Sequence, residues 1–110
     1  MKFFDRNGAA TAYLEDGTIY KWDGKPVAYF NGDNIYAFNG AHLGWLTDGW
    51  VIDHNGNRSL FTDGAAGGPP LPYKQFEPFK GFKGFLPFKG FEAIPPFKPF
   101  LSSTWSHSIF

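Results

Sequence analysis

Two short segments combine the carboxylates, amides and imidazoles that carry most protein chemistry: residues 5–8 (Asp-Arg-Asn-Gly) and 53–57 (Asp-His-Asn-Gly-Asn). Clustered oxygens of this kind bind calcium, but a complete calcium loop ends in a bidentate Glu. The twelfth position is Asp16 when counted from Asp5 and Gly64 when counted from Asp53. We therefore expect these side chains to cap their own turns, and we expect no metal site.

Histidine and carboxylate pairs elsewhere give no stronger signal. The three histidines are His42, His54 and His107, their spacing matches no zinc motif, and the chain has no Cys to complete one. Asp48 and Asp53 lie near His54, but carboxylates recur in this chain as turn residues, and no Ser stands in a nucleophile elbow. We expect no catalytic residue, no cofactor and no enzyme activity.

Length and charge limit the other classes of function. The 110 residues, 12.3 kDa, allow one compact domain. Ten basic side chains balance ten acidic ones, which removes the electrostatic argument for a nucleic-acid partner. The first residues lack the apolar core of a secretory signal, and no apolar run approaches a membrane span. By default we expect a cytoplasmic protein.

The turns and strands that carry these residues repeat along the chain. Asn-Gly or Asp-Gly pairs recur every sixteen residues, with turn glycines at Gly8, Gly24, Gly40 and Gly56. Apolar columns keep the same phase, for example Phe4, Tyr20, Tyr36 and Ile52. Four copies without insertion or deletion indicate one unit written four times over residues 1–64.

Each copy carries a second turn signal half a repeat later: Asp16-Gly17, Asn31-Gly32, Asp48-Gly49 and Asp63-Gly64. The phase of this signal changes by one residue, so the sequence leaves the register open there. Aromatic and β-branched segments of about six residues separate the turns, which predicts strands. We expect four consecutive β-hairpins that close around an axis, since closure removes exposed strand edges; a stacked solenoid is the alternative.

Residues 16–29 (Asp-Gly-Thr-Ile-Tyr-Lys-Trp-Asp-Gly-Lys-Pro-Val-Ala-Tyr) and 38–45 (Phe-Asn-Gly-Ala-His-Leu-Gly-Trp) carry a family resemblance. The chain resembles the bacterial four-fold β-flower proteins, whose tails tend to carry Leu where this one has Phe. The resemblance implies four hairpins arranged as petals about a pseudo-four-fold axis. It implies no activity.

Five aromatic residues could form a stacking surface for sugars, although core packing explains the column-matched ones better: Tyr20, Trp22, Tyr36, Trp45 and Trp50. Trp50 breaks its column, because the other copies have Lys2, Thr18 and Asn34 at that position. We therefore expect Trp50 to be an exposed contact residue.

Beyond a Gly/Pro linker at residues 65–72, the chain has a period of three over residues 73–100. One column is aromatic or apolar, the next is mostly charged, and the third is mostly Gly or Pro. Three residues per turn fits polyproline II. Such a segment would span roughly 85 Å, so we expect it to bend at glycines or to leave its own body.

Self-association is the function that this tail favours. An extended strand cannot bury its own rings, and exposed apolar rings invite partners. The candidate contact residues are Phe76, Phe79, Phe82, Phe85, Phe88, Phe91, Phe97 and Phe100. We therefore expect a non-catalytic, homo-oligomeric module. A carbohydrate- or membrane-binding module is the alternative, since Phe-Lys-Gly repeats also suit a lipid interface.

Charge adds a reason for the tail to dock. Residues 1–64 hold five basic and eight acidic side chains, whereas residues 72–100 hold five Lys and two Glu. The net charges of −3 and +3 would attract tail to body, within one chain or between chains. Residues 101–110 alternate Ser with larger residues, which is typical of a strand.

Overall fold

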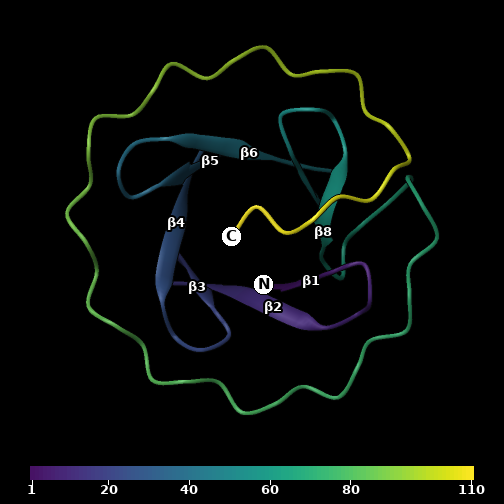
Figure 1. Cartoon of the computed structure of the whole chain (residues 1–110), viewed down its shortest axis with the longest axis horizontal. Coiled ribbons are helices and arrows are strands. Elements are labelled where there is room, and N and C mark those ends of the chain that lie inside the picture. Colours follow the sequence, from purple (N-terminus) through teal and green to yellow (C-terminus); the bar gives the residue numbers. More distant parts are fainter.

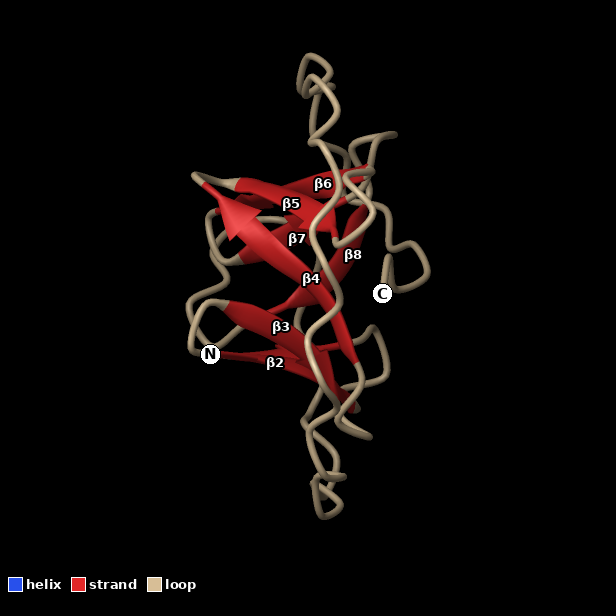
Figure 2. Ribbon diagram, turned by 90° about the vertical axis from the view of Figure 1, so that its left-hand side faces the viewer, coloured by secondary structure: helices blue, strands red, loops and turns tan.

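The computed structural model describes residues 1–110 and is all β, with no helix. The chain forms a flattened disc with extents of 37 × 37 × 19 Å (Figures 1 and 2). Both termini lie near its centre, on opposite faces. The strands are β1 (Lys2–Phe4), β2 (Ala10–Glu15), β3 (Thr18–Lys21), β4 (Pro26–Asn31), β5 (Asn34–Ala37), β6 (His42–Thr47), β7 (Trp50–Ile52) and β8 (Arg58–Phe61).

The eight strands pair antiparallel in chain order, and β1 meets β8 through Phe4 and Phe61 to close a barrel. The prediction of hairpins closed around an axis is therefore confirmed, and the solenoid is excluded. Every strand has two neighbours. Closure leaves no open sheet edge to pair with another chain.

Turn chemistry explains the phase change in the second turn signal. The two-residue turns at 16–17 and 48–49 have positive φ at both residues, as a type I′ turn requires. The turn between β4 and β5 has positive φ at Gly32 but not at Asp33, which is the pattern of type II′. Loop length and sixteen-residue spacing are therefore conserved, and only the place of Gly within the turn changes.

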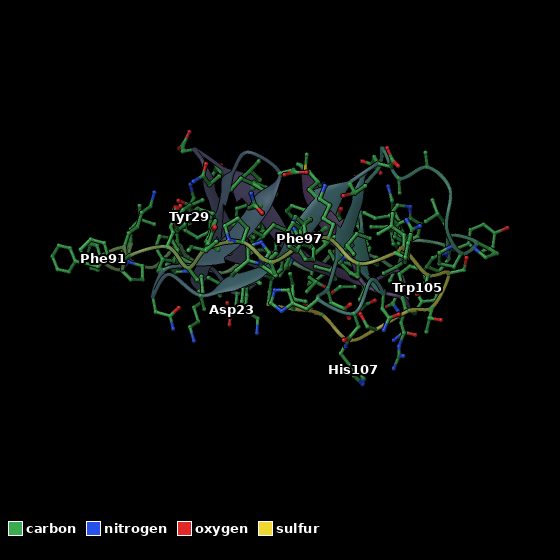
Figure 3. The ribbon with its side chains drawn as sticks, turned by 90° about the horizontal axis from the view of Figure 1, so that it is seen from above. Asp23, Tyr29, Phe91, Phe97, Trp105 and His107 are labelled. Atoms are coloured by element: carbon green, nitrogen blue, oxygen red, sulfur yellow. The ribbon has the colours of Figure 1, made fainter.

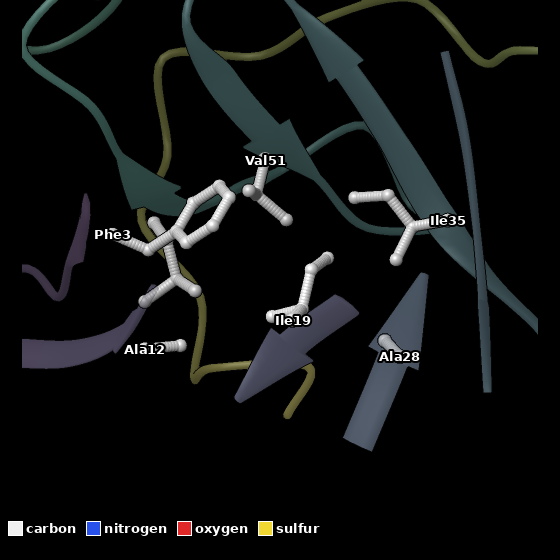
Figure 4. Packing of buried hydrophobic residues seen from close by; sticks show 7 residues of the cluster. Phe3, Ala12, Ile19, Ala28, Ile35 and Val51 are labelled. Carbon is white, nitrogen blue, oxygen red and sulfur yellow. The ribbon is translucent and has the colours of Figure 1, made fainter. Parts of the chain in front are cut away.

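One residue from each strand lies at the centre of the barrel interior, and further apolar side chains such as Leu14, Phe30 and Leu46 pack against them. Large and small side chains face each other across the strands, as in the pairs Phe3–Ala12 and Ile19–Ala28. These residues pack into one cluster around the axis (Figure 4): Phe3, Ala12, Ile19, Ala28, Ile35, Val51 and Leu60. Gly44 takes the remaining place, because a Cβ atom there would lie 2.1 Å from the carbonyl oxygen of Ile52.

The opposite face of the sheet carries the larger aromatic residues. A register shift recurs at the same point of β1, β3, β5 and β7. Ring pairs lie across the hairpins, with Tyr13 and Tyr20 stacked at 5.5 Å between centroids and Tyr29 and Tyr36 at 6.1 Å. Since a strand alternates its side chains between faces, mostly aliphatic residues and Phe3 line the inside of the barrel, and the Tyr pairs lie on its outside.

The C-terminal segment covers one face of the disc. It contributes one isolated parallel bridge, Arg58 to Trp105, rather than the full strand that its alternation predicts. The Ser59 hydroxyl donates to the carbonyl of His107 and accepts from the amide of Ile109. The ring of Phe110 meets that of Phe3 edge-on at 5.9 Å, so the chain end caps the core.

Candidate functional site

The tail, residues 73–100, circles the outer face of its own barrel (Figure 1). Of the two expected outcomes, bending or leaving its own body, the structure shows the tail on its own body, curved gradually rather than bent at single glycines. A segment of roughly 85 Å fits around about three quarters of a circle 37 Å across. The chain wraps along the circumference instead of crossing a diameter, so it needs neither a sharp bend nor another body.

Backbone hydrogen bonds join the tail to each of the four hairpins, which we call petals. From one contact to the next, the tail advances by nine residues and the body by sixteen. We call residues 73–81, 82–90, 91–99 and the partial 100–102 the tail units. The third residue of each unit donates to a turn glycine: Gln75 to Gly8 (2.9 Å), Gly84 to Gly24 (2.9 Å), Ala93 to Gly40 (2.8 Å) and Ser102 to Gly56 (2.9 Å). The four petals thus hold four equivalent points of the tail.

The four turn glycines are needed for this approach. A Cβ atom on Gly8, Gly24, Gly40 or Gly56 would lie within 2.1 Å of a tail carbonyl oxygen. All four also have positive φ, between 80° and 97°. The turns themselves are capped by their own side chains, as expected: Asp5 accepts from Asn7 and Ala9, and Asp53 from Asn55 and Asn57.

The Gly column of the tail faces the body. Gly81 donates to the carbonyl of Trp22 at 2.9 Å and Gly90 to that of Phe38 at 2.7 Å. A Cβ atom on Gly81 would lie 2.0 Å from the carbonyl oxygen of Asp23. The glycines therefore permit close backbone contact rather than bends.

The Lys column also faces the body. The ammonium groups lie over the aromatic outer face of the barrel, within the range of a cation–π interaction. The contacts are Lys74 over Phe4 (4.6 Å), Lys80 over Tyr13 (4.2 Å) and Trp22 (5.2 Å), Lys83 over Tyr20 (5.5 Å) and Lys89 over Tyr29 (4.0 Å). The aromatic residues of the body are thus the surface on which the tail lies.

Ion pairs follow the same register. The second residue of a tail unit meets the end of a hairpin strand: Lys74 pairs with Asp63, and Lys83 with Glu15. Lys98 pairs with Asp33, and Glu77 with Lys2. These pairs realise the attraction expected from the opposite charges of body and tail, although each is solvent-exposed and contributes only about 0–1 kcal/mol.

The third unit reverses the charge. Glu92 stands where units one and two have Lys, and it accepts hydrogen bonds from Tyr29 Oη (2.8 Å) and Asn31 Nδ2 (2.7 Å). The bonds from Asn31 and Tyr29 hold the pKa of Glu92 below its ordinary value. Burial first, and then the hydrogen bond to Glu92, raises the pKa of Tyr29 to about 12.

The aromatic column of the tail points away from the body. Its residues are 91% to 102% exposed: Tyr73, Phe76, Phe79, Phe82, Phe85, Phe88, Phe91, Ile94, Phe97 and Phe100. We call these ten residues the belt. Phe91 projects beyond the rim of the disc (Figure 3). The belt brings together all eight Phe residues that the sequence indicates for self-association, and none of them is covered by its own chain.

Trp50 is not an exposed contact residue. It is fully buried, donates to the carbonyls of Ala66 and Gly67, and packs against Phe61 and Trp105. Its column changes from polar to aromatic because the linker and the C-terminal segment cover only this petal. The repeat pattern could not reveal that cover, since it lies outside residues 1–64.

Sequence spacing also hides a histidine pair. His42 and His54 stack at 5.1 Å, with Nδ1 of His42 2.9 Å from Nε2 of His54 and Nε2 of His42 3.0 Å from Asn34 Oδ1. No third His, Asp or Glu joins them. Burial, and second the His54 ring, lowers the pKa of His42. His107 lies apart on the exposed C-terminal segment.

Four hairpins form the barrel, and each makes an equivalent contact with the tail. This four-fold repetition agrees with one protein family. The sequence matches the family of the 4-fold beta flower protein over residues 1–110. The chain belongs to the 4-fold beta flower family. No curated protein and no solved structure matches this beta-flower chain.

The family match spans the tail as well as the petals of the beta flower. The structure has no helix, and therefore none that is long and apolar enough to cross a membrane. The resemblance of residues 16–29 and 38–45 thus identified the family. The sixteen-residue period was a further signal for it, and the ratio of nine to sixteen was the signal that sequence reasoning missed.

Proposed function

We propose that this beta-flower chain is a non-catalytic module that self-associates through the belt. The observation that carries the proposal is the outward direction of the belt, whose ten side chains are almost completely exposed. Burying one such ring contributes roughly 1.5–3 kcal/mol. Large apolar patches exposed on a protein surface mark interaction sites.

The ring shape of the belt favours several neighbours. The belt residues belong to the tail, whose backbone runs around most of the circumference (Figure 1). A single partner that approaches from one side covers only one sector, which leaves the remaining rings in water. Side-by-side association of discs buries sector after sector, so we expect assemblies larger than a dimer.

A membrane surface is the weaker alternative. Interfacial binding places aromatic rings in the lipid and Lys on the headgroups. Here Lys80 and Lys89 turn inward onto Tyr13 and Tyr29, and Lys74 and Lys83 pair with carboxylates. The lysines are therefore engaged by the body, and a flat bilayer would meet only one sector of the belt.

A carbohydrate surface also has less support. The stacking residues considered for sugars are largely inside the molecule, since Tyr20, Tyr36, Trp45 and Trp50 are buried. Trp22 is only half-buried, but Lys80 lies over its ring. The belt residues, in contrast, are almost completely exposed.

Light scattering of the full chain tests the proposal. Replacing Phe79, Phe82, Phe85 and Phe88 by Ser should reduce the assembly, while the matched Phe→Leu variant, which keeps apolar area, should retain it. These side chains contact nothing in their own chain, so near-UV circular dichroism should be unchanged. A native chain that is monomeric would refute self-association. Binding to liposomes or to a glycan array that the Ser variant loses would favour the alternative.

A further inference from the structure

We propose that the rim of the body is a recognition site for extended peptides with a nine-residue period, and that it takes the tail of a second copy of this chain. The rim consists of the four turn glycines, the aromatic outer face of the barrel and the strand ends that pair with the tail. The inference concerns this inner surface and does not rest on association through the belt.

The backbone carbonyls of the rim select the spacing of the amides that a ligand presents. Each petal offers one carbonyl to the third residue of a tail unit. The petals of Gly24 and Gly40 also offer one to the ninth residue of the preceding unit, where Gly81 and Gly90 donate to Trp22 and Phe38. The ninth residue of unit three is Pro99, which has no N–H to donate. A ligand must therefore present amides six and nine residues apart, with no side chain at the ninth position of the first two units.

Side chains at the strand ends select the register in which the tail units align with the petals. The second residue of the first three units meets Asp63, Glu15 and Asn31 in turn, and it is Lys, Lys and Glu. Moving the tail back by one unit would place Glu92 opposite Glu15. Moving it forward would take Glu92 away from Asn31 and Tyr29. The four petals have equivalent backbones, so these charges select one of the possible alignments.

The mode of attachment allows exchange between copies. The belt residues bury nothing on the body. The tail from residue 73 to 100 is held by backbone hydrogen bonds, cation–π contacts, exposed ion pairs and side-chain hydrogen bonds such as those from Tyr29 to Glu92 and from Tyr36 to the carbonyl of Ala93. Each of these contributes modestly. The tail of a second copy presents the same amides and the same charges, so a loosened petal is complementary to it.

A peptide without belt rings tests recognition by the rim alone. The probe is a fluorescent peptide of residues 73–90 in which every belt residue is replaced by Ser: Tyr73, Phe76, Phe79, Phe82, Phe85 and Phe88. The receptor is the full chain with Lys80→Glu and Lys83→Glu, which weakens its own tail on the first two petals. Lys25→Glu is the matched control, because Lys25 is exposed and pairs with no tail residue.

Fluorescence anisotropy should show the probe binding the loosened chain at least about tenfold more tightly than the native or Lys25→Glu chain. A probe that carries Lys83→Glu should bind about tenfold more weakly, and Glu15→Lys in the receptor should restore it. Absence of binding to the loosened chain, or equal binding of the two probes, would overturn the proposal. Because the probe lacks the belt rings, failure of belt association would leave this result unchanged.

Discussion

The carbonyl oxygen of Phe82 lies only 1.9 Å from the position that a Cβ atom of Gly24 would occupy. Gly24 ends a turn of the body, and Phe82 begins the second tail unit, fifty-eight residues later. The same relationship joins Gly8 to Tyr73, Gly40 to Phe91 and Gly56 to Phe100. A glycine that the sequence explains as a turn residue of a hairpin is thus also the point at which the tail contacts the body.

Substituting this glycine should separate the two roles. Gly17 has a comparable φ of 79°, against 97° for Gly24, but open space where a Cβ atom would be. Gly17→Ala should therefore lower the free energy of unfolding by about 1 kcal/mol, from backbone strain alone. Gly24→Ala should cost at least about 1 kcal/mol more, and it should make the tail around Phe82 more sensitive to proteases.

Urea unfolding and limited proteolysis of the two variants measure these effects. Equal losses of stability, with unchanged cleavage near Phe82, would show that the tail does not rest on the turn.

Trp50→Ala should unfold the protein rather than remove a contact with a ligand. Trp50 is fully buried between the sheet and the C-terminal segment, whereas Trp22 is half-buried at the rim. Truncating a buried Trp costs about 3–5 kcal/mol. We expect Trp22→Ala to cost distinctly less in the same thermal or urea unfolding experiment. A Trp50→Ala chain of native stability would contradict the assigned burial.

Acid should weaken the contact between the two petals that carry the histidine pair. The pKa of His42 is lower in the folded chain, because of burial and the nearby His54. The unfolded chain therefore binds more protons, and stability is lost as pH falls below the ordinary His value of about 6.5. His42→Gln should flatten the pH dependence of unfolding in this window, and the exposed His107→Gln should not. An equal effect of both variants would exclude the pair as its source.

The Tyr29–Glu92 contact gives a second titration. Tyr29 Oη donates to Glu92, and burial and this bond together raise its pKa to about 12. Glu92→Gln should lower the pKa of Tyr29 without restoring the ordinary value, because burial remains. Glu77→Gln, which removes the pair with Lys2 instead, is the control. An ultraviolet titration that shows no change for Glu92→Gln would mean that the tail does not reach this petal.

The repeat made the barrel predictable from sequence. A sixteen-residue period with two turn signals predicts consecutive hairpins. Closing these hairpins into a barrel pairs the strand edges that would otherwise stay open. The alternation of Ile19 and Tyr20 between faces is equally local. The register at Gly32 was not predictable, because type I′ and II′ turns place Gly differently while keeping the same loop length.

The tail was harder to place for a geometric reason. Its period of three shows which side chains share an edge, but not whether the Lys or the Phe edge faces the body. The rings of Phe4 and Tyr20 decide this in favour of Lys, through cation–π contacts with Lys74 and Lys83. The pairing of His42 with His54 depends on the register of β6 against β7, which joins two petals and which residue spacing alone does not encode.

Sedimentation of the native chain at two salt concentrations tests the central claim, that the belt drives association, most directly. Raising salt from ~0.05 to ~0.5 M shortens the Debye length from about 14 to about 4 Å. Ion pairs such as Lys83–Glu15 weaken under this change, whereas burial of belt rings does not. The account predicts that the assembly persists at the higher salt concentration and is reduced in the Phe79, Phe82, Phe85 and Phe88→Ser variant. Dissociation of the native assembly at high salt would contradict it.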